Sequence, residues 1–102
     1  MNNHNTKLLT IITEAALESR LINDIEQLGA LGYTITNARG KGSRGLRSGT
    51  WEASANIRIE IICGPELANQ LADHMQKKYY ENYAMVTFTS DVEVLRPNKF
   101  SN

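Results

Sequence analysis

The sequence has a single cysteine and no long hydrophobic run among its 102 residues. Its apolar runs are only a few residues long, whereas a membrane-spanning helix needs about 18 apolar residues in succession, so no membrane span is expected. Cys63 has no second cysteine to bond and no histidine nearby, which excludes an intrachain disulfide and a cysteine-rich zinc site. We therefore predict that Cys63 is a residue of the hydrophobic core.

An excess of charge of either sign is also missing, because 11 basic residues balance 11 acidic ones. Overall charge thus favours neither nucleic acid nor a membrane surface as a partner. The N-terminal residues 1–6 lack the basic start and apolar stretch of a secretory signal, so a cytoplasmic location is expected. The length allows one hydrophobic core, and we predict a single domain over residues 1–102 with a polar tail at 97–102.

The first elements of the chain follow two different hydrophobic periods. Residues 7–13 form an apolar, β-branched run that is typical of a buried strand. From residue 14 to residue 29, apolar side chains recur every three or four positions, which predicts an amphipathic helix. We expect Thr13 to cap the start of this helix, and Gly29 or Gly32 to supply the positive-φ residue that ends it.

The remaining pattern predicts an α+β, ferredoxin-like fold with the order β-α-β-β-α-β. A second strand is expected at 33–38, a third at 55–61 with Ile57, Ile59 and Ile61 on one face, and a fourth at 85–89. A second helix begins at the Gly-Pro-Glu sequence of residues 64–66 and extends to about residue 80. We also expect a short last strand at 92–95. Such an order places both helices on one face of an antiparallel sheet.

A long loop between the second and third strands, at about residues 40–55, concentrates charge and flexibility. Between Ala38 and Trp51 there are four basic residues, no acidic residue and four of the seven glycines. Glycines allow backbone amides to turn toward an anion, while arginine, lysine and serine side chains donate charge-assisted hydrogen bonds. We interpret the loop as an anion site, with a solvated flexible loop as the alternative. The predicted residues are Gly40, Lys41, Gly42, Ser43, Arg44 and Arg47.

Two common phosphate motifs do not account for this loop. Residues 40–45 match the letters G-x-G-x-x-G, but residues 46–50 have little to sustain the helix that the dinucleotide fingerprint requires. The P-loop pattern fails as well, because no Gly-Lys-Ser/Thr triplet closes a glycine loop. The segment is therefore a distinct kind of basic glycine loop.

Outside the loop, residues that could carry chemistry have simpler interpretations. Arg58 and Glu60 share a strand face and are expected to pair across the sheet. His4 and His74 have no second ligand at a useful spacing, so no metal site is expected. No Ser-His-Asp or Cys-His set and no pair of catalytic carboxylates is suggested by the spacing, so we do not expect an enzyme. Expected at packing or subunit contacts are Tyr79, Tyr80 and Tyr83.

The chain resembles the PII-like signalling proteins, and within them the SbtB-type regulators of bicarbonate transport and the carboxysome-associated PII proteins. The resemblance extends from Lys7 to about Phe100. It is most specific in the run from Gly32-Tyr33-Thr34 through Asn37 to the basic glycine loop, then in Ala55-Asn56-Ile57, and in Tyr83-Ala84 leading to Glu93-Val94-Leu95.

This resemblance implies a homotrimer that binds adenine nucleotides in the three clefts between neighbouring copies. It implies that Gly40, Lys41, Gly42, Ser43, Arg44 and Arg47 face the phosphates, and we add Asn37 and Thr87 because they lie near the ends of strands bordering such a cleft. The candidate ligands are AMP, ADP, ATP and cyclic AMP, with bicarbonate as a further candidate. The loop is expected to dock on a membrane bicarbonate transporter, at the inner face of the membrane, and nucleic acid is not an expected partner.

The C-terminal residues of the chain differ from those of many SbtB-type proteins, and this difference favours one of the two branches. Many SbtB-type proteins carry a C-terminal extension with a cysteine pair, whereas residues 96–102 contain no cysteine. Redox control through that tail is not expected, and the carboxysome-associated branch, linked with ADP or AMP and bicarbonate, is the closer one. Two alternatives remain open: an RNA-binding module, although the third strand lacks the aromatic residues that stack on bases, and a slow nucleotide phosphohydrolase, although no base or metal carboxylate is identifiable.

Overall fold

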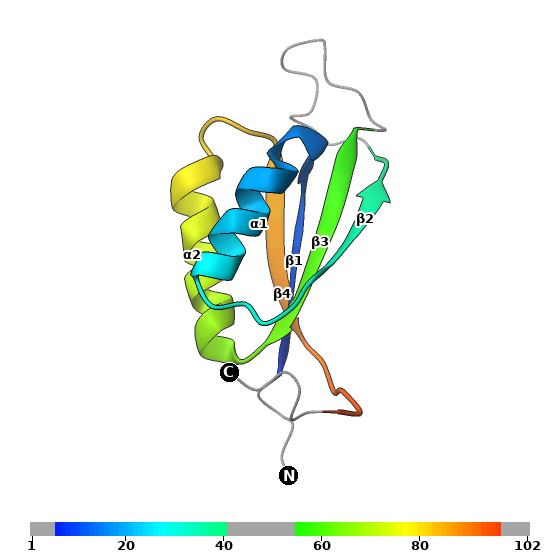
Figure 1. Ribbon diagram of the computed structural model, residues 1–102, viewed down its shortest axis with the longest axis vertical. Helices are drawn as coiled ribbons and strands as arrows, with labels where there is room; N and C mark the ends of the chain where they lie inside the picture. Colours follow the sequence, from blue (N-terminus) through cyan, green and yellow to red (C-terminus); the bar gives the residue numbers. More distant parts are fainter. Residues whose placement is uncertain (1–5, 41–54, 97–102) are drawn as a thin grey trace.

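A four-stranded antiparallel sheet with two helices packed on one face makes up the protein (Figure 1). The computed structural model describes residues 6–40 and 55–96. The elements are β1 (Lys7–Glu14), a 3-10 turn η1 (Ala15–Leu17), α1 (Glu18–Gln27), β2 (Thr34–Ala38), β3 (Asn56–Cys63), α2 (Pro65–Tyr79) and β4 (Met85–Asp91). The strand order is β2-β3-β1-β4, so each helix connects two strands that are not neighbours in the sheet. The ferredoxin-like α+β fold expected from the sequence is confirmed.

The core lies between the sheet and the helices and is built from the periodic residues of each. In the strand register Leu9 lies opposite Ile61, and Ile11 opposite Ile59, and all four side chains are at most 1% exposed. Burying a side chain of this size stabilises the fold by about 1.5–3 kcal/mol. Cys63 is also in the core, as predicted, and burial raises the pKa of its thiol. The helices contribute Leu17, Leu21, Ile25, Leu67, Leu71, Met75 and Tyr79.

The start of the first helix differs from the prediction. Thr13 does not cap it, because this residue is buried inside β1 and its hydroxyl donates to the carbonyl of Ala84, at 2.8 Å. The chain passes through η1 before α1 begins at Glu18. The other end of the helix agrees with the prediction, since Gly29 has a φ of +112°. The hydroxyl of a threonine at the end of a strand can bond either to the start of the next helix or to a turn from a distant part of the chain. The local sequence does not distinguish these two partners.

The expected last strand at 92–95 is wrong. β4 ends at Asp91, and the segment after it makes one backbone hydrogen bond, from the Val92 amide to the Thr6 carbonyl at 3.1 Å, within the described residues. Leu95 is then 99% exposed. The alternating sequence could pair with another strand, but β1 begins at Lys7, so the described part of the chain offers no strand for these residues to pair with.

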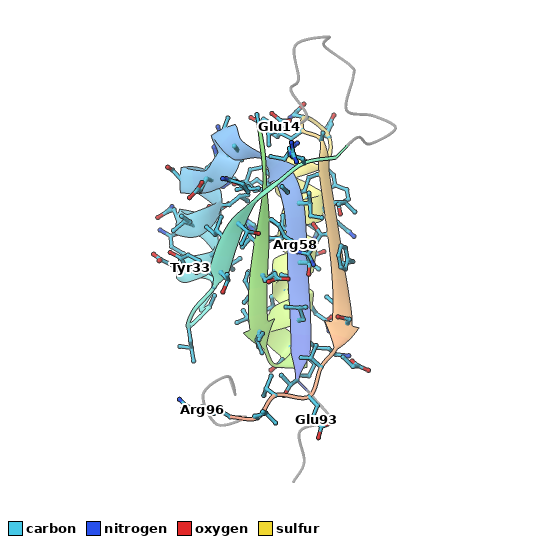
Figure 2. All side chains as sticks on the ribbon, turned by 90° about the vertical axis from the view of Figure 1, so that its right-hand side faces the viewer. Glu14, Tyr33, Arg58, Glu93 and Arg96 are labelled. Carbon is cyan, nitrogen blue, oxygen red and sulfur yellow. The ribbon has the colours of Figure 1, made fainter. Side chains whose placement is uncertain are left out.

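The two faces of the sheet have different surroundings. Both helices pack on one face, while no helix in the described residues covers the other, which we call the open face (Figure 1). Figure 2 looks onto the open face, with Arg58 near its middle. Arg58 and Glu60 pair there, but along β3 rather than across the sheet, with 3.2 Å between Nε and Oε2. The residues of the open face used below are Thr10, Ile12, Arg58, Glu60 and Phe88.

Candidate functional site

The predicted loop leaves and re-enters the sheet at one end, which we call the loop end. Ala38, the last residue of β2, lies opposite Asn56, the first residue of β3. The Ala15 amide donates to the Ala55 carbonyl at 2.8 Å, which joins the entry into β3 to the turn that follows β1. The ends of three neighbouring strands are therefore held together at the loop end.

Glu14 ties a further element to the loop end (Figure 2). Its carboxylate accepts a hydrogen bond from the Ala84 amide at 3.2 Å, while Thr13 donates to the carbonyl of the same residue. Both backbone groups of Ala84, in the turn between α2 and β4, are thus satisfied by side chains at the end of β1. No local pattern predicts this contact, because Glu14 and Ala84 are 70 residues apart.

The predicted site residues fall into two groups. Asn37 is exposed on β2, Gly40 is exposed just beyond the end of that strand, and Thr87 is half-buried in β4. The other five lie outside the described residues and stay predictions: Lys41, Gly42, Ser43, Arg44 and Arg47.

Asn37 and Thr87 share a face of the sheet but lie on opposite edges of it. Asn37 is paired with Ile57 and Thr87 with Ile11, and both of these isoleucines point toward the helices. Three strand spacings separate β2 from β4, which amounts to about 14 Å. One copy of the chain therefore does not bring these two side chains together.

Thr87 has an unexpected partner in Tyr80. The Thr87 amide donates to the Tyr80 hydroxyl at 2.9 Å, so this tyrosine covers part of the free edge of β4. The Thr87 hydroxyl is buried and has no hydrogen-bond partner among the described residues. The sequence predicted a packing or contact role for Tyr80, but helical periodicity contains no information about which strand edge its hydroxyl reaches.

A second polar cluster, the Asp24 cluster, joins the two helices. Asp24 on α1 is 7% exposed, and its carboxylate accepts hydrogen bonds from three residues of α2: Tyr79 at 2.6 Å, His74 at 3.0 Å and Lys78 at 3.0 Å. Burial raises the pKa of Asp24, but these bonds favour the charged form and outweigh it, so the pKa is lowered. Burial and the bond to Asp24 raise the pKa of Tyr79. This cluster holds the helices together and was missed by sequence reasoning.

Residues 6–40 and 55–96 contain neither a cluster of metal ligands nor a membrane-spanning helix. Within these ranges, no three histidine, cysteine, aspartate or glutamate side chains lie close enough together to hold a metal ion. None of the helices there is long and apolar enough to cross a membrane.

The family model for nitrogen regulatory protein P-II matches residues 6–99. The chain belongs to the P-II family. The predicted membership of the PII family is thereby confirmed. The arrangement of sheet and helices is similar to that of a PII-like protein of known structure.

Solved structures of PII-like proteins resemble this P-II family member over nearly its whole length. A PII-like signalling protein from Thermus thermophilus is 43% identical, with 95% of this chain and 96% of that chain covered and a TM-score of 0.79. CPII from Thiomonas intermedia K12, bound to ADP, AMP and acetate, is 33% identical, with 97% of each chain covered and a TM-score of 0.80. The same protein bound to ADP, AMP and bicarbonate is 33% identical, with 97% and 96% covered and a TM-score of 0.79.

Proposed function

We propose that this chain is a non-enzymatic signalling protein that binds ADP or AMP together with bicarbonate between the copies of a homotrimer. In this proposal the ligands change the state of the segment at about 40–55, which then regulates an inorganic-carbon transporter at the inner face of the membrane. Membership of the P-II family supports a signalling role. The ligands in the CPII structures, at 33% identity over nearly the whole chain, support adenine nucleotide and bicarbonate. The carboxysome-associated branch is the one we propose.

The positions of Asn37 and Thr87 are the main support for a ligand site between two copies of the chain. The two residues share the helix-covered face but lie at opposite edges, about 14 Å apart. A ligand that contacts both needs the β2 edge of one copy beside the β4 edge of another. Contacts between two different edges repeat head to tail, and a ring of such contacts closes with rotational symmetry, which a trimer satisfies.

The chemistry of the predicted residues suits a phosphate-bearing ligand. Lys41, Arg44 and Arg47 supply three cations, and arginine binds phosphate through two parallel hydrogen bonds. Acetate and bicarbonate, the two small anions in the CPII structures, share a planar pair of oxygens, which supports an anion subsite beside the nucleotide.

Isothermal titration calorimetry tests the ligand. We expect saturable binding of ADP or AMP with close to one site per chain, and tighter binding when bicarbonate is present. The double variant Arg44→Ala/Arg47→Ala should bind at least tenfold more weakly, with an unchanged circular dichroism spectrum. Lys77→Ala, an exposed cation on α2, is the matched control and should bind like the wild type. Absence of binding for AMP, ADP, ATP and cyclic AMP alike would refute the proposal.

The transporter role has its own test. Membrane vesicles that contain a bicarbonate transporter should retain the protein after sedimentation, in an amount that changes when ADP or AMP is added. Vesicles without the transporter are the control. Equal retention by both vesicle types would contradict regulation through such a partner, whatever the nucleotide affinity.

A further inference from the structure

Tyr79, the last residue of α2, is bonded to the other helix by its side chain and to the following turn by its backbone. The side chain is fully buried, and its hydroxyl donates to Asp24 on α1 at 2.6 Å. The Tyr79 carbonyl accepts hydrogen bonds from the amides of Asn82 and Tyr83, at 3.2 and 3.0 Å. A shift of α1 against α2 therefore acts on Tyr79 and, through its carbonyl, on the α2–β4 turn, which we define as residues 80–84.

The far end of the α2–β4 turn is held at the loop end of the sheet (Figure 1). Ala84 donates its amide to Glu14 and accepts a hydrogen bond from Thr13 at its carbonyl. The next residue after β1, Ala15, donates to the carbonyl of Ala55, immediately before β3. The turn is thus bonded to the helices on one side, and on the other side to the point where the chain enters β3.

A second contact from α1 reaches the same turn. Arg20 donates to the Tyr83 hydroxyl at 3.2 Å, and its guanidinium carbon lies 5.7 Å from the centre of the Tyr83 ring. The rings of Tyr79 and Tyr83 are themselves 5.9 Å apart. Arg20 and Asp24 are four residues apart and so share one side of α1. Two neighbouring side chains of one helix therefore hold the start and the middle of the turn.

Tyr80, the first residue of the turn, bonds to a predicted site residue. Its hydroxyl accepts a hydrogen bond from the Thr87 amide at 2.9 Å. The position of the α2–β4 turn therefore affects the β4 edge as well as the loop end, and these are the two places to which the predicted ligand residues belong.

A charged carboxylate is a costly way to join two helices. Asp24 is 7% exposed, and moving a charge out of water is unfavourable unless several hydrogen bonds offset the loss of hydration. Apolar residues of similar volume often replace a buried ion pair without loss of stability. Directional bonds add a fixed position of the groups that they join, here Tyr79 and Lys78 relative to α1. This geometry favours a positioning role over a purely stabilising one.

We propose that Asp24 and Tyr79 are positioning residues for the ligand site, because through the α2–β4 turn they hold the loop end and the β4 edge in the arrangement that binds the nucleotide. This inference rests on the adenine-nucleotide site of the proposed function, and it adds two residues that need not touch the ligand. Removing one member of such a network changes binding at a distant site by about twofold to thirtyfold.

The nucleotide affinity of folded variants tests the inference. Tyr79→Phe keeps the ring and removes the hydroxyl that reaches Asp24. Calorimetry well below the unfolding temperature should show that ADP or AMP binds about threefold to tenfold more weakly. The matched control is Ile25→Val, which removes one methyl group from a fully buried side chain of the same helix. This control should unfold at a lower denaturant concentration but bind like the wild type.

Amide hydrogen exchange, measured by NMR, separates positioning from a general loss of stability. In Tyr79→Phe the amides of Ala84 and Thr87 should exchange severalfold faster than in the wild type, while those of β3 keep their rates, because only the turn opens locally. In Ile25→Val the turn should show no selective change. Wild-type rates at Ala84 and Thr87 in Tyr79→Phe would overturn the inference.

A second variant breaks the same series of contacts at its other end. Thr13→Val removes the donor to the Ala84 carbonyl, and it should also weaken binding. If both residues act through the α2–β4 turn, the double variant Tyr79→Phe/Thr13→Val should bind no more weakly than the weaker single variant. Two fold-changes that multiply in the double variant would show independent effects and would overturn the inference.

The outcomes also distinguish this inference from the proposed function. If the wild type binds ADP or AMP and Tyr79→Phe binds them equally well, the positioning role is wrong and the nucleotide site of the proposed function stands. If the wild type binds no adenine nucleotide, both are refuted.

Discussion

The Asp24 cluster between the helices and the open face of the sheet differ in how far one chain satisfies their side chains. On the helix side, Asp24 is 7% exposed and receives hydrogen bonds from Tyr79, His74 and Lys78. On the open face, Thr10 is fully buried yet has a hydroxyl with no partner among the described residues, and Phe88 is 44% exposed. The Asp24 cluster is therefore satisfied within one copy, whereas Thr10 on the open face has a buried hydroxyl without a partner among the described residues, as Thr87 has on the helix-covered face.

The largest loss of stability should come from truncating Ile11 of β1, and the neighbouring Ile12, which points to the opposite face, gives the comparison. Ile11 is fully buried under the helices, and Ile11→Ala should lower the free energy of unfolding by about 2–5 kcal/mol. Ile12 on the open face is half-buried, so Ile12→Ala should cost only about 1 kcal/mol in the dissociated subunit. Urea denaturation at several protein concentrations measures both. If both variants lost the same free energy of unfolding at every protein concentration, the two faces would not differ in burial as we expect.

Asp24→Asn should remove the negative charge that accepts the hydrogen bonds of the Asp24 cluster. Hydrogen bonds to a charged group contribute about 1.5–3 kcal/mol, so we expect a loss of that order near neutral pH. The pKa of Asp24 is lowered by folding, so its stabilisation is present above the pKa of the unfolded chain and is lost as the pH falls through the lower folded value. The difference between wild type and variant should therefore shrink below about pH 4.

The control for this variant is Asp73→Asn, at an exposed carboxylate of α2 that pairs with Lys77. Exposed helix pairs of this kind contribute about 0.3–0.5 kcal/mol, so the control should unfold almost like the wild type. A difference between wild type and Asp24→Asn that stays constant from about pH 7 to about pH 3, across the usual aspartate pKa, would contradict the charged role of Asp24.

Two buried threonines of β1 sharpen the comparison at a smaller scale. Thr13 is 2% exposed and donates to the Ala84 carbonyl, so Thr13→Val should cost about 1 kcal/mol or more, because that carbonyl loses its donor. Thr10→Val removes a hydroxyl that has no partner among the described residues, so it should leave the dissociated subunit as stable or more stable. Denaturation of both at low protein concentration decides this. A loss for Thr10→Val equal to that for Thr13→Val would show that the open face is already satisfied.

The smallest expected effect concerns the ion pair of the open face. Arg58 and Glu60 are partly exposed, and surface pairs contribute about 0–1 kcal/mol. Arg58→Ala should therefore change the unfolding free energy of the subunit by less than about 0.5 kcal/mol. Thermal unfolding curves of the wild type and the variant at low protein concentration measure this change. A large loss at the lowest concentration would mean that Arg58 acts mainly within the chain.

Local sequence patterns predicted most of the fold because they report burial on one element at a time. The alternation of Ile57, Ile59 and Ile61 identified β3 and its buried face, and the three-to-four spacing identified both helices. Gly29 ended the first helix as expected. The last strand was predicted from alternation alone and is wrong, because a strand also needs a neighbour, and the register leaves none there among the described residues.

For the candidate site, the sequence alone predicts the chemistry, through four basic residues and four glycines between Ala38 and Trp51. It also indicated the P-II family, which the family model confirms. Only the tertiary structure decided that Asn37 and Thr87 lie on opposite edges of one sheet, that Tyr80 covers an edge amide, and that Asp24 is held by three residues of α2. The physical reason is distance along the chain. Periodicity reflects contacts within a few residues, whereas these contacts arise from the strand order and helix packing, which no local pattern encodes.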